Sequence, residues 1–162
     1  MTGQLLADRL GWPYFDSDVE VERQTGRTVP EIWKADGEGA FRAEETRVLS
    51  QAIASDKPSI VAVAGGAILD PANRALIRGA GLVVWLRADV SVLAARVGDG
   101  AGRPLLESGP EAALGRLSTV RAPLYADLAD VVFDVGRLSP TQVTDLIVAA
   151  LRERGVEEDC HA

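Results

Sequence analysis

Short apolar runs separated by helical segments constrain most strongly how this chain can fold. Residues 59–64 (SIVAVA) and 82–86 (LVVWL) have the length and composition of strands buried on both faces, and residues 131–135 form a third such run. Between these runs apolar residues recur at helical spacing, as at Val48 and Ala52. The alternation predicts an α/β domain with a mostly parallel sheet.

The same pattern predicts where the elements begin and end. Pro123 should end the helix that precedes it, and Ser139 or Thr141 should cap the last helix. We expect one domain over residues 1–154 and a flexible tail over residues 155–162. Helices are expected at residues 2–10, 17–24, 28–33, 37–55, 71–78, 90–97, 111–121 and 141–154, with one further strand at 13–16.

Composition and charge exclude several classes of function. The formal net charge of −7 argues against a nucleic-acid-binding face, and no apolar window of about 18 residues predicts a membrane span. The only histidine, His161, leaves no basis for a histidine triad or a zinc site. The only cysteine is Cys160, and residues 1–11 lack the apolar centre of a signal peptide. We therefore expect a cytoplasmic protein that binds neither nucleic acid nor membranes. We also expect a monomer, although no feature of the sequence fixes the oligomeric state.

Polar and glycine residues stand where two predicted strands end, and in parallel sheets ligands bind beyond those ends. Asp16 and Asp18 follow the first strand, and in an extended segment this spacing sends both carboxylates to one side. One could hold a metal and the other a substrate hydroxyl, or Ser17 or Asp18 could merely cap the next helix. Gly65 and Gly66 follow the run 59–64; they permit positive φ and close approach of a ligand, or form an ordinary turn.

Several arginines could bind an anion. Arg103 follows residues 98–102 (GDGAG), which predict a mobile loop, and an arginine there suits a lid that closes over a phosphate. Taken alone, Arg42 and Arg96 are equally compatible with solvated surface cations. Arg121 could likewise only bind the carbonyls at a helix end.

Five segments in a fixed order carry a resemblance to a known family. They are FDSD (15–18), EVERQTGRTVPEIWKADGEGAFRAEE (20–45), AGGAI (64–68), RPLL (103–106) and RAPLY (121–125). In this order and spacing the chain resembles the shikimate kinase family up to about residue 154. The resemblance implies a P-loop kinase-like, three-layer α/β domain with a parallel sheet. It also implies transfer of the ATP γ-phosphate to the 3-hydroxyl of shikimate, with Mg²⁺, in chorismate and aromatic amino-acid biosynthesis.

The resemblance assigns roles to individual residues. Asp18 would contact the accepting hydroxyl as a catalytic residue, and Arg42 and Arg121 would hold the shikimate carboxylate. Such pairs of planar guanidinium groups fix the direction of a carboxylate. The remaining matches are Gly65 and Gly66 beside shikimate, Asp16 near Mg²⁺, Arg103 as the catalytic lid arginine on the ATP phosphates, and Arg96 and Arg137 at the nucleotide.

The sequence departs from the family at its first residues. The family opens with a strand followed by G-x-x-x-x-G-K-[ST], and no segment here fits that pattern. Residues 1–4 match the helix that this loop should enter, as a start assigned at an internal methionine would explain. By the resemblance, the missing first strand is the central one of five. We therefore expect neighbouring strands with unpaired edges, and little kinase activity without the phosphate-binding loop.

A second departure is Ala64, which replaces the first glycine of the family's GGG turn and disfavours positive φ. Two alternative functions remain open at this point. One is an inactive fragment or a non-catalytic module that binds shikimate without using ATP. The other is a related small-molecule kinase, such as a gluconate kinase, against which the paired arginines argue.

Overall fold

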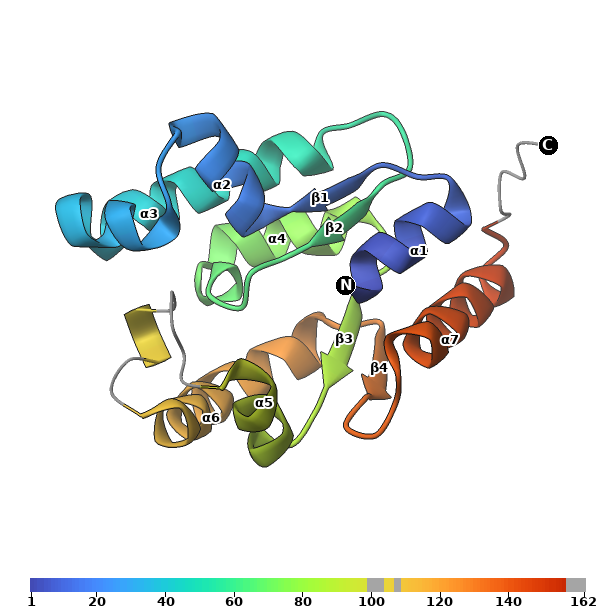
Figure 1. Cartoon of the computed structure of the whole chain (residues 1–162). Helices are drawn as coiled ribbons and strands as arrows, with labels where there is room; N and C mark the ends of the chain where they lie inside the picture. The colour runs from blue at the N-terminus through green and yellow to red at the C-terminus, as the bar shows by residue number, and fades with distance from the viewer. Residues whose placement is uncertain (99–103, 107–108, 157–162) are drawn as a thin grey trace.

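The computed structural model describes residues 1–98, 104–106 and 109–156, in which strands and helices alternate (Figure 1). This confirms the predicted α/β class. The strands are β1 (Tyr14–Asp16), β2 (Ile60–Ala62), β3 (Val84–Arg87) and β4 (Val131–Asp134). The helices are α1 (Thr2–Leu10), α2 (Ser17–Thr25), α3 (Val29–Ile53), α4 (Pro71–Ala80), α5 (Val90–Val97), α6 (Pro110–Leu128) and α7 (Pro140–Glu153), with 3-10 helices η1 (Ala67–Leu69) and η2 (Pro104–Leu106).

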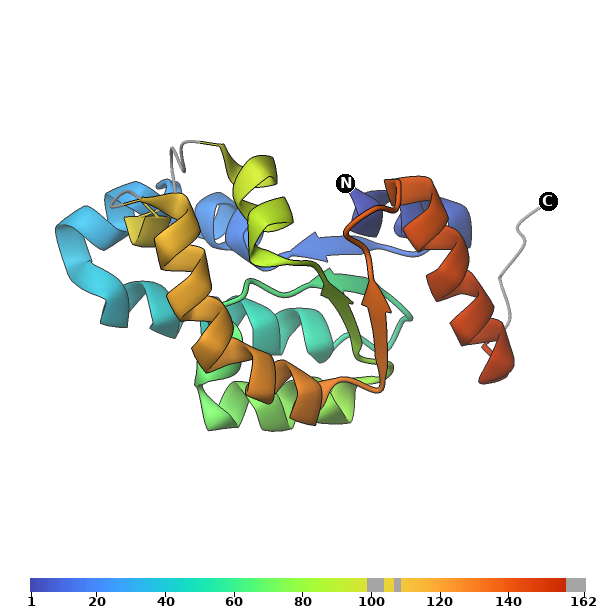
Figure 2. The same ribbon diagram turned by 90° about the horizontal axis from the view of Figure 1, so that it is seen from below.

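The described strands form two separate parallel pairs. Tyr14 of β1 lies opposite Ile60 of β2, and Val84 of β3 lies opposite Val131 of β4. Within the described ranges no ladder of hydrogen bonds joins β2 to β3. Figure 1 shows the two pairs apart, and in the view from below β3 and β4 overlap β1 and β2 (Figure 2). The predicted unpaired strand edges are therefore present, on β2 and on β3.

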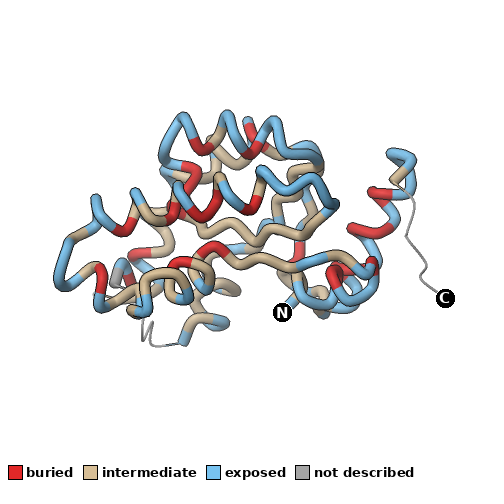
Figure 3. Tube along the Cα trace, turned by 90° about the horizontal axis from the view of Figure 1, so that it is seen from above, coloured by how far each residue is buried: buried red, intermediate tan, exposed pale blue. Residues whose placement is uncertain are grey.

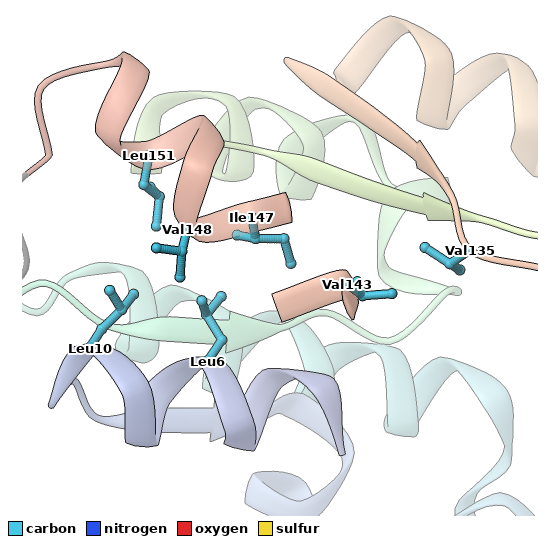
Figure 4. Close-up of a cluster of buried hydrophobic side chains, with 7 residues drawn as sticks. All are labelled: Leu6, Leu10, Val135, Val143, Ile147, Val148 and Leu151. Carbon is cyan, nitrogen blue, oxygen red and sulfur yellow. The ribbon is translucent and has the colours of Figure 1, made fainter. Parts of the chain in front are cut away.

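Helices on both faces hold the two strand pairs together. Adjacent strand residues point to opposite faces, so Ile60 packs toward α1 and α7 while Val61 packs toward α3, α4 and α6. Likewise, Val84 packs on the same face as Ile60, and Val83 packs on the same face as Val61. The result is a three-layer arrangement. The cluster on the first face consists of Leu6, Leu10, Val135, Val143, Ile147, Val148 and Leu151 (Figure 4); that on the second consists of Leu49, Ala67, Ile68, Ile77 and Leu128.

The strands are less buried than the apolar runs predicted. No residue of the four described strands reaches the fully buried class, and Leu86 and Val132 are 38% and 42% exposed. In Figure 3 the buried positions fall mainly on the helices. The prediction of strands buried on both faces was wrong in this respect, because β2 and β3 each have only one hydrogen-bonded neighbour among the described strands.

Helix α3 contains the two helices that the sequence predicted, joined end to end. Gly37 interrupts it with φ of 83° and ψ of 174°, a conformation that glycine adopts without strain. A third cluster (Val21, Ile32, Phe41 and Val48) packs α2 against both parts of α3. The kink thus lets one continuous segment cover α2 and still carry Arg42 toward the strand ends.

Helix α6 corrects the prediction that Pro123 ends a helix. It runs without interruption from Pro110 to Leu128 with Pro123 inside it. Proline removes one backbone donor and strains the preceding turn. The helix continues because Leu124, Tyr125 and Leu128 beyond the proline pack into the second cluster, and tertiary burial outweighs the local preference.

The caps of two helices were only partly predicted. Ser139 caps α7 in a reciprocal box with Gln142, which decides between the two candidates named above. For α2, the cap is Asp16 itself, not Ser17 or Asp18. Of the predicted mobile loop at 98–102, only Gly98 lies within the described residues. Most of the predicted tail also lies outside them. Within the described ranges, no helix combines the length and apolar character needed to span a bilayer.

Candidate active site

Arg42 lies at the centre of the site on the inner side of α3. Its Nη1 donates to both carboxylate oxygens of Glu45, at 3.1 and 2.9 Å, and its Nε and Nη2 donate to Glu38 at 3.3 and 3.2 Å. The side chain of Arg42 is 24% exposed, and that of Glu45 is fully buried. Arg42 is therefore not a freely solvated surface cation; a buried carboxylate one helical turn away fixes its guanidinium.

Arg121 approaches the same place from α6. Its Nε is buried and has no hydrogen-bond partner among the described residues. Burial lowers the pKa of its guanidinium, and the nearby charge of Arg42 acts in the same direction. Because α6 continues past this residue, Arg121 does not bind helix-end carbonyls as the alternative prediction had it. A partly buried cation with an unpaired, buried Nε donor is suited to an anionic ligand.

The turn at Gly65 and Gly66 is what both arginines face. A Cβ on Gly65 would lie 2.9 Å from Tyr125 Oη and 3.0 Å from Arg121 Nη1, and a Cβ on Gly66 would overlap the Arg42 guanidinium. Neither glycine has a positive φ, so the conformational reason predicted for them was wrong. A side chain at either position would have to displace Arg42, or Arg121 and Tyr125, from the places they occupy beside the turn.

The two aspartates occupy different positions from those predicted. Asp16 Oδ1 accepts from the backbone N–H of Asp18 and Val19, at 3.1 and 3.3 Å, and its Oδ2 accepts from Tyr14 Oη at 3.3 Å. Asp18 belongs to the first turn of α2 rather than to an extended segment, so the argument that both carboxylates point to one side of a strand does not apply.

Ser17 joins the aspartates to the glycine turn. It is 4% exposed, and its Oγ accepts a hydrogen bond of 2.9 Å from the backbone N–H of Ala64. Asp18 also lies close enough to Glu45 for its charge to raise the pKa of that carboxyl. The strand ends of β1 and β2 are thereby held together, and Asp18 shares one electrostatic environment with Glu45 and the two arginines.

Glu45 is the buried acid of this environment. Burial raises the pKa of its carboxyl above the ordinary value, against the opposing effect of the hydrogen bonds from Arg42. Tyr125 is partly buried, which raises the pKa of its hydroxyl, and its ring stacks on Trp85 at a centroid distance of 5.3 Å. Sequence reasoning gave neither residue a role at the site. For Glu45, its position three residues after Arg42 was the available signal.

The predicted nucleotide-side residues lie elsewhere. Arg96 on α5 donates from Nη2 to the carbonyl of Val135 at 2.9 Å, so it ties its helix to the segment after β4 rather than standing free in solvent. Arg137 lies in the same segment and is exposed. No hydrogen bond or ion pair joins either residue to the arginine pair in the part of the chain that the structure describes. Arg103, the predicted lid arginine, lies outside the described residues.

Fold and site together define a class of protein. The chain is an α/β protein with a glycine turn, two arginines and two aspartates beyond the ends of parallel strands, which is the edge where such sheets bind their ligands. The family model "Shikimate kinase" matches residues 1–152, and the chain therefore belongs to the shikimate kinase family.

Individual relatives agree with this assignment. The shikimate kinase of Ruegeria pomeroyi is 41% identical over 153 residues, covering 94% of this chain and 78% of the relative. That of Thermobifida fusca is also 41% identical, over 94% of this chain and 88% of its own length. Among solved structures, the shikimate kinase from Acinetobacter baumannii in complex with shikimate superposes with a TM-score of 0.91, at 33% identity, over 96% of this chain and 87% of that one.

Proposed function

We propose that this chain acts as an ATP-dependent kinase that transfers a phosphoryl group to the 3-hydroxyl of shikimate, using the residues assigned below. The observation that carries the proposal is the convergence of Arg42 from α3 and Arg121 from α6 on the Gly65–Gly66 turn. A relative of the same fold was solved with shikimate bound.

The two arginines recognise the carboxylate of shikimate. Arg42 is held in place by Glu45 and Glu38, so it approaches the ligand from a fixed direction. Arg121 supplies the buried Nε that has no partner among the described residues. Two guanidinium groups from different helices define the orientation of the ring as well as its charge. This favours shikimate over a gluconate-like substrate, whose flexible chain offers no fixed ring.

Asp18 binds the hydroxyl that accepts the phosphoryl group. It lies at the N-terminus of α2, close enough to Glu45 to influence its ionisation. A carboxylate in this position orients the attacking oxygen and accepts its proton. Phosphoryl transfer depends mainly on such positioning and on compensation of negative charge.

The residues present fit a magnesium ion only in a limited way. No group of three or more metal-binding side chains occurs in the described ranges. Mg²⁺ commonly uses one or two carboxylates, with phosphate oxygens and water completing its shell. Asp16 at the end of β1 fits such a role through Oδ2, which accepts a single long hydrogen bond of 3.3 Å from Tyr14 Oη within the described residues. The ion, when bound, neutralises charge on the phosphates of ATP.

The phosphate side of the reaction requires groups beyond these. No segment of the 162 residues fits G-x-x-x-x-G-K-[ST]. The residues assigned above are therefore those that bind shikimate, and Arg96, Arg103 and Arg137 are the proposed nucleotide contacts.

We also propose a cytoplasmic monomer. The single cysteine among 162 residues supports a reducing compartment. Sedimentation measurements in solution would test whether the protein is a monomer.

The acceptor-side proposal can be tested by binding alone. Shikimate and 3-deoxyshikimate are titrated into the wild type and into Asp18→Asn. The wild type should prefer shikimate, and the variant should lose most of that preference while it still binds both ligands. An unchanged preference would remove Asp18 from the hydroxyl site. Tight binding of gluconate in the same assay would favour the alternative kinase.

A further inference from the structure

Two consecutive side chains of α4, those of Asn73 and Arg74, donate hydrogen bonds to η1, the short helix that follows the glycine turn. Asn73 Nδ2 donates to the carbonyl of Ala67 at 3.1 Å. Arg74 Nη1 donates to the carbonyls of Ile68 and Leu69 at 2.6 and 3.1 Å. Three successive carbonyls of η1, the short helix that follows Gly66, thus receive side-chain donors from one neighbouring helix.

Asn73 also reaches the helix that carries Arg42. Its Nδ2 lies 3.0 Å from Oγ1 of Thr46 on α3, directly after Glu45 in the sequence. The Ala67 carbonyl can only accept, so the amide must present its NH₂ group here. Asn73 is 1% exposed, and its Oδ1 has no hydrogen-bond partner among the described residues. A buried amide of this kind is costly unless its bonds are made.

We infer that Asn73 is a positioning residue for shikimate binding: it fixes the Gly65–Gly66 turn against α3, and so sets the spacing between that turn and Arg42. The inference rests on the proposed function, since it assumes that the turn and the arginines bind shikimate. The clearance at the turn is so small that a Cβ on Gly66 would overlap Arg42. A small displacement of the turn therefore changes the position of the guanidinium.

The test uses two variants and a matched control. Asn73→Ala removes both bonds, and Thr46→Val removes only the bond to α3 in a side chain of similar shape. The control is Thr144→Val in α7, because Thr144 is 2% exposed and its Oγ1 donates to the Pro140 carbonyl at 2.9 Å, away from the turn. Shikimate affinity is measured by calorimetry at a temperature where circular dichroism shows every variant folded.

We expect Asn73→Ala to weaken shikimate binding about tenfold and Thr46→Val about threefold. Thr144→Val should bind shikimate as the wild type does, even where its melting temperature falls as far as that of Asn73→Ala. Affinity within twofold of the wild type in folded Asn73→Ala would overturn the inference. If Asn73→Ala does not fold, Thr46→Val decides on the same criterion. An equal loss of affinity in the control would also overturn it.

Hydrogen exchange separates this inference from the proposed function. The amides of Ala67 and Leu69 donate within the turn to the carbonyls of Ala64 and Gly66, at 3.0 and 3.1 Å. Asn73→Ala should accelerate their exchange at least tenfold relative to Thr144→Val. A wild type that binds no shikimate would contradict the proposed function, whereas unchanged exchange in Asn73→Ala would contradict the role of Asn73 in holding the turn.

Discussion

The hydroxyl oxygen of Ser17 accepts a hydrogen bond of 2.9 Å from the backbone N–H of Ala64, 47 positions later in the chain. This bond joins the end of β1, with its two aspartates, to the turn that carries the two site glycines. Ser17 is 4% exposed, so the bond is shielded from water. The bond links the segment of Asp16 and Asp18 directly to that turn.

Replacing Ser17 tests how much this bond contributes to the fold. Ser17→Ala leaves the Ala64 N–H buried without its acceptor, and the free energy of unfolding should fall by about 1–3 kcal/mol. Urea unfolding followed by circular dichroism measures the change. Ser55→Ala is the control, since Ser55 is exposed and its local bonds lie in a surface turn; there we expect a change of at most about 0.5 kcal/mol. Equal effects in both variants would contradict the shielding of Ser17.

Gly66 should be intolerant of alanine for a reason specific to binding. The added Cβ meets the tip of the Arg42 side chain, which can move, so Gly66→Ala should fold with little loss of stability. The displaced guanidinium should then weaken shikimate binding at least tenfold, about 1.4 kcal/mol or more.

Gly79→Ala is the control for Gly66→Ala. Gly79 lies in α4 with nothing within 4 Å of a built Cβ. This variant should gain about 0.5–1 kcal/mol of stability and keep its affinity for shikimate. Normal affinity in Gly66→Ala would show that Arg42 does not need its present position.

Removing the Arg42 side chain should affect binding of shikimate far more than binding of ATP. A hydrogen bond to a charged group contributes about 1.5–3 kcal/mol, so Arg42→Ala should raise the shikimate Kd about 10- to 150-fold. Arg47→Ala on the same helix is the matched control, because Arg47 pairs with Glu44 at the surface and should leave the Kd unchanged. If both ligands lost affinity equally in Arg42→Ala, the carboxylate assignment would be wrong.

Glu45 should give the protein a characteristic pH dependence. Burial raises the pKa of Glu45 above its ordinary value of 4.5, so the folded state binds this proton more tightly than the unfolded state does. As the pH rises from 4.5 through the raised pKa, the wild type should therefore lose stability relative to Glu45→Gln, and the difference should level off above that pKa. Urea unfolding of both proteins across this range measures it. A difference that moved the opposite way would mean that the pairing with Arg42 outweighs burial.

The sequence predicted the elements well where local signals and packing agree. Helices α1 and α5 have the predicted bounds, and Gly37 divides α3 where the predicted helices at 28–33 and 37–55 meet. The prediction that the helix ends before Pro123 was wrong because the residues after the proline pack against residues distant in sequence. The half-exposed strands could not be predicted from composition, because burial depends on how many neighbours a strand has in space.

The site was predicted residue by residue more through resemblance than through spacing. Spacing predicted chemistry beyond the strand ends, but its argument that Asp16 and Asp18 share one side of an extended segment does not hold, because Asp16 caps α2 and Asp18 lies in its first turn. Glycine was expected for its positive φ, whereas Gly65 and Gly66 are required by close side chains. Glu45 and Asn73 went unpredicted because their importance lies in contacts made only once α3, α4 and η1 pack together.

The most direct test of the account is a calorimetric titration of the full chain with shikimate and, in parallel, with shikimate methyl ester. The ester keeps the ring and all three hydroxyls but removes the charge that Arg42 and Arg121 are proposed to bind. We expect saturable binding of shikimate and at least tenfold weaker binding of the ester. Equal affinity for the two ligands, or no binding of shikimate, would contradict the central claim that the paired arginines form a carboxylate site.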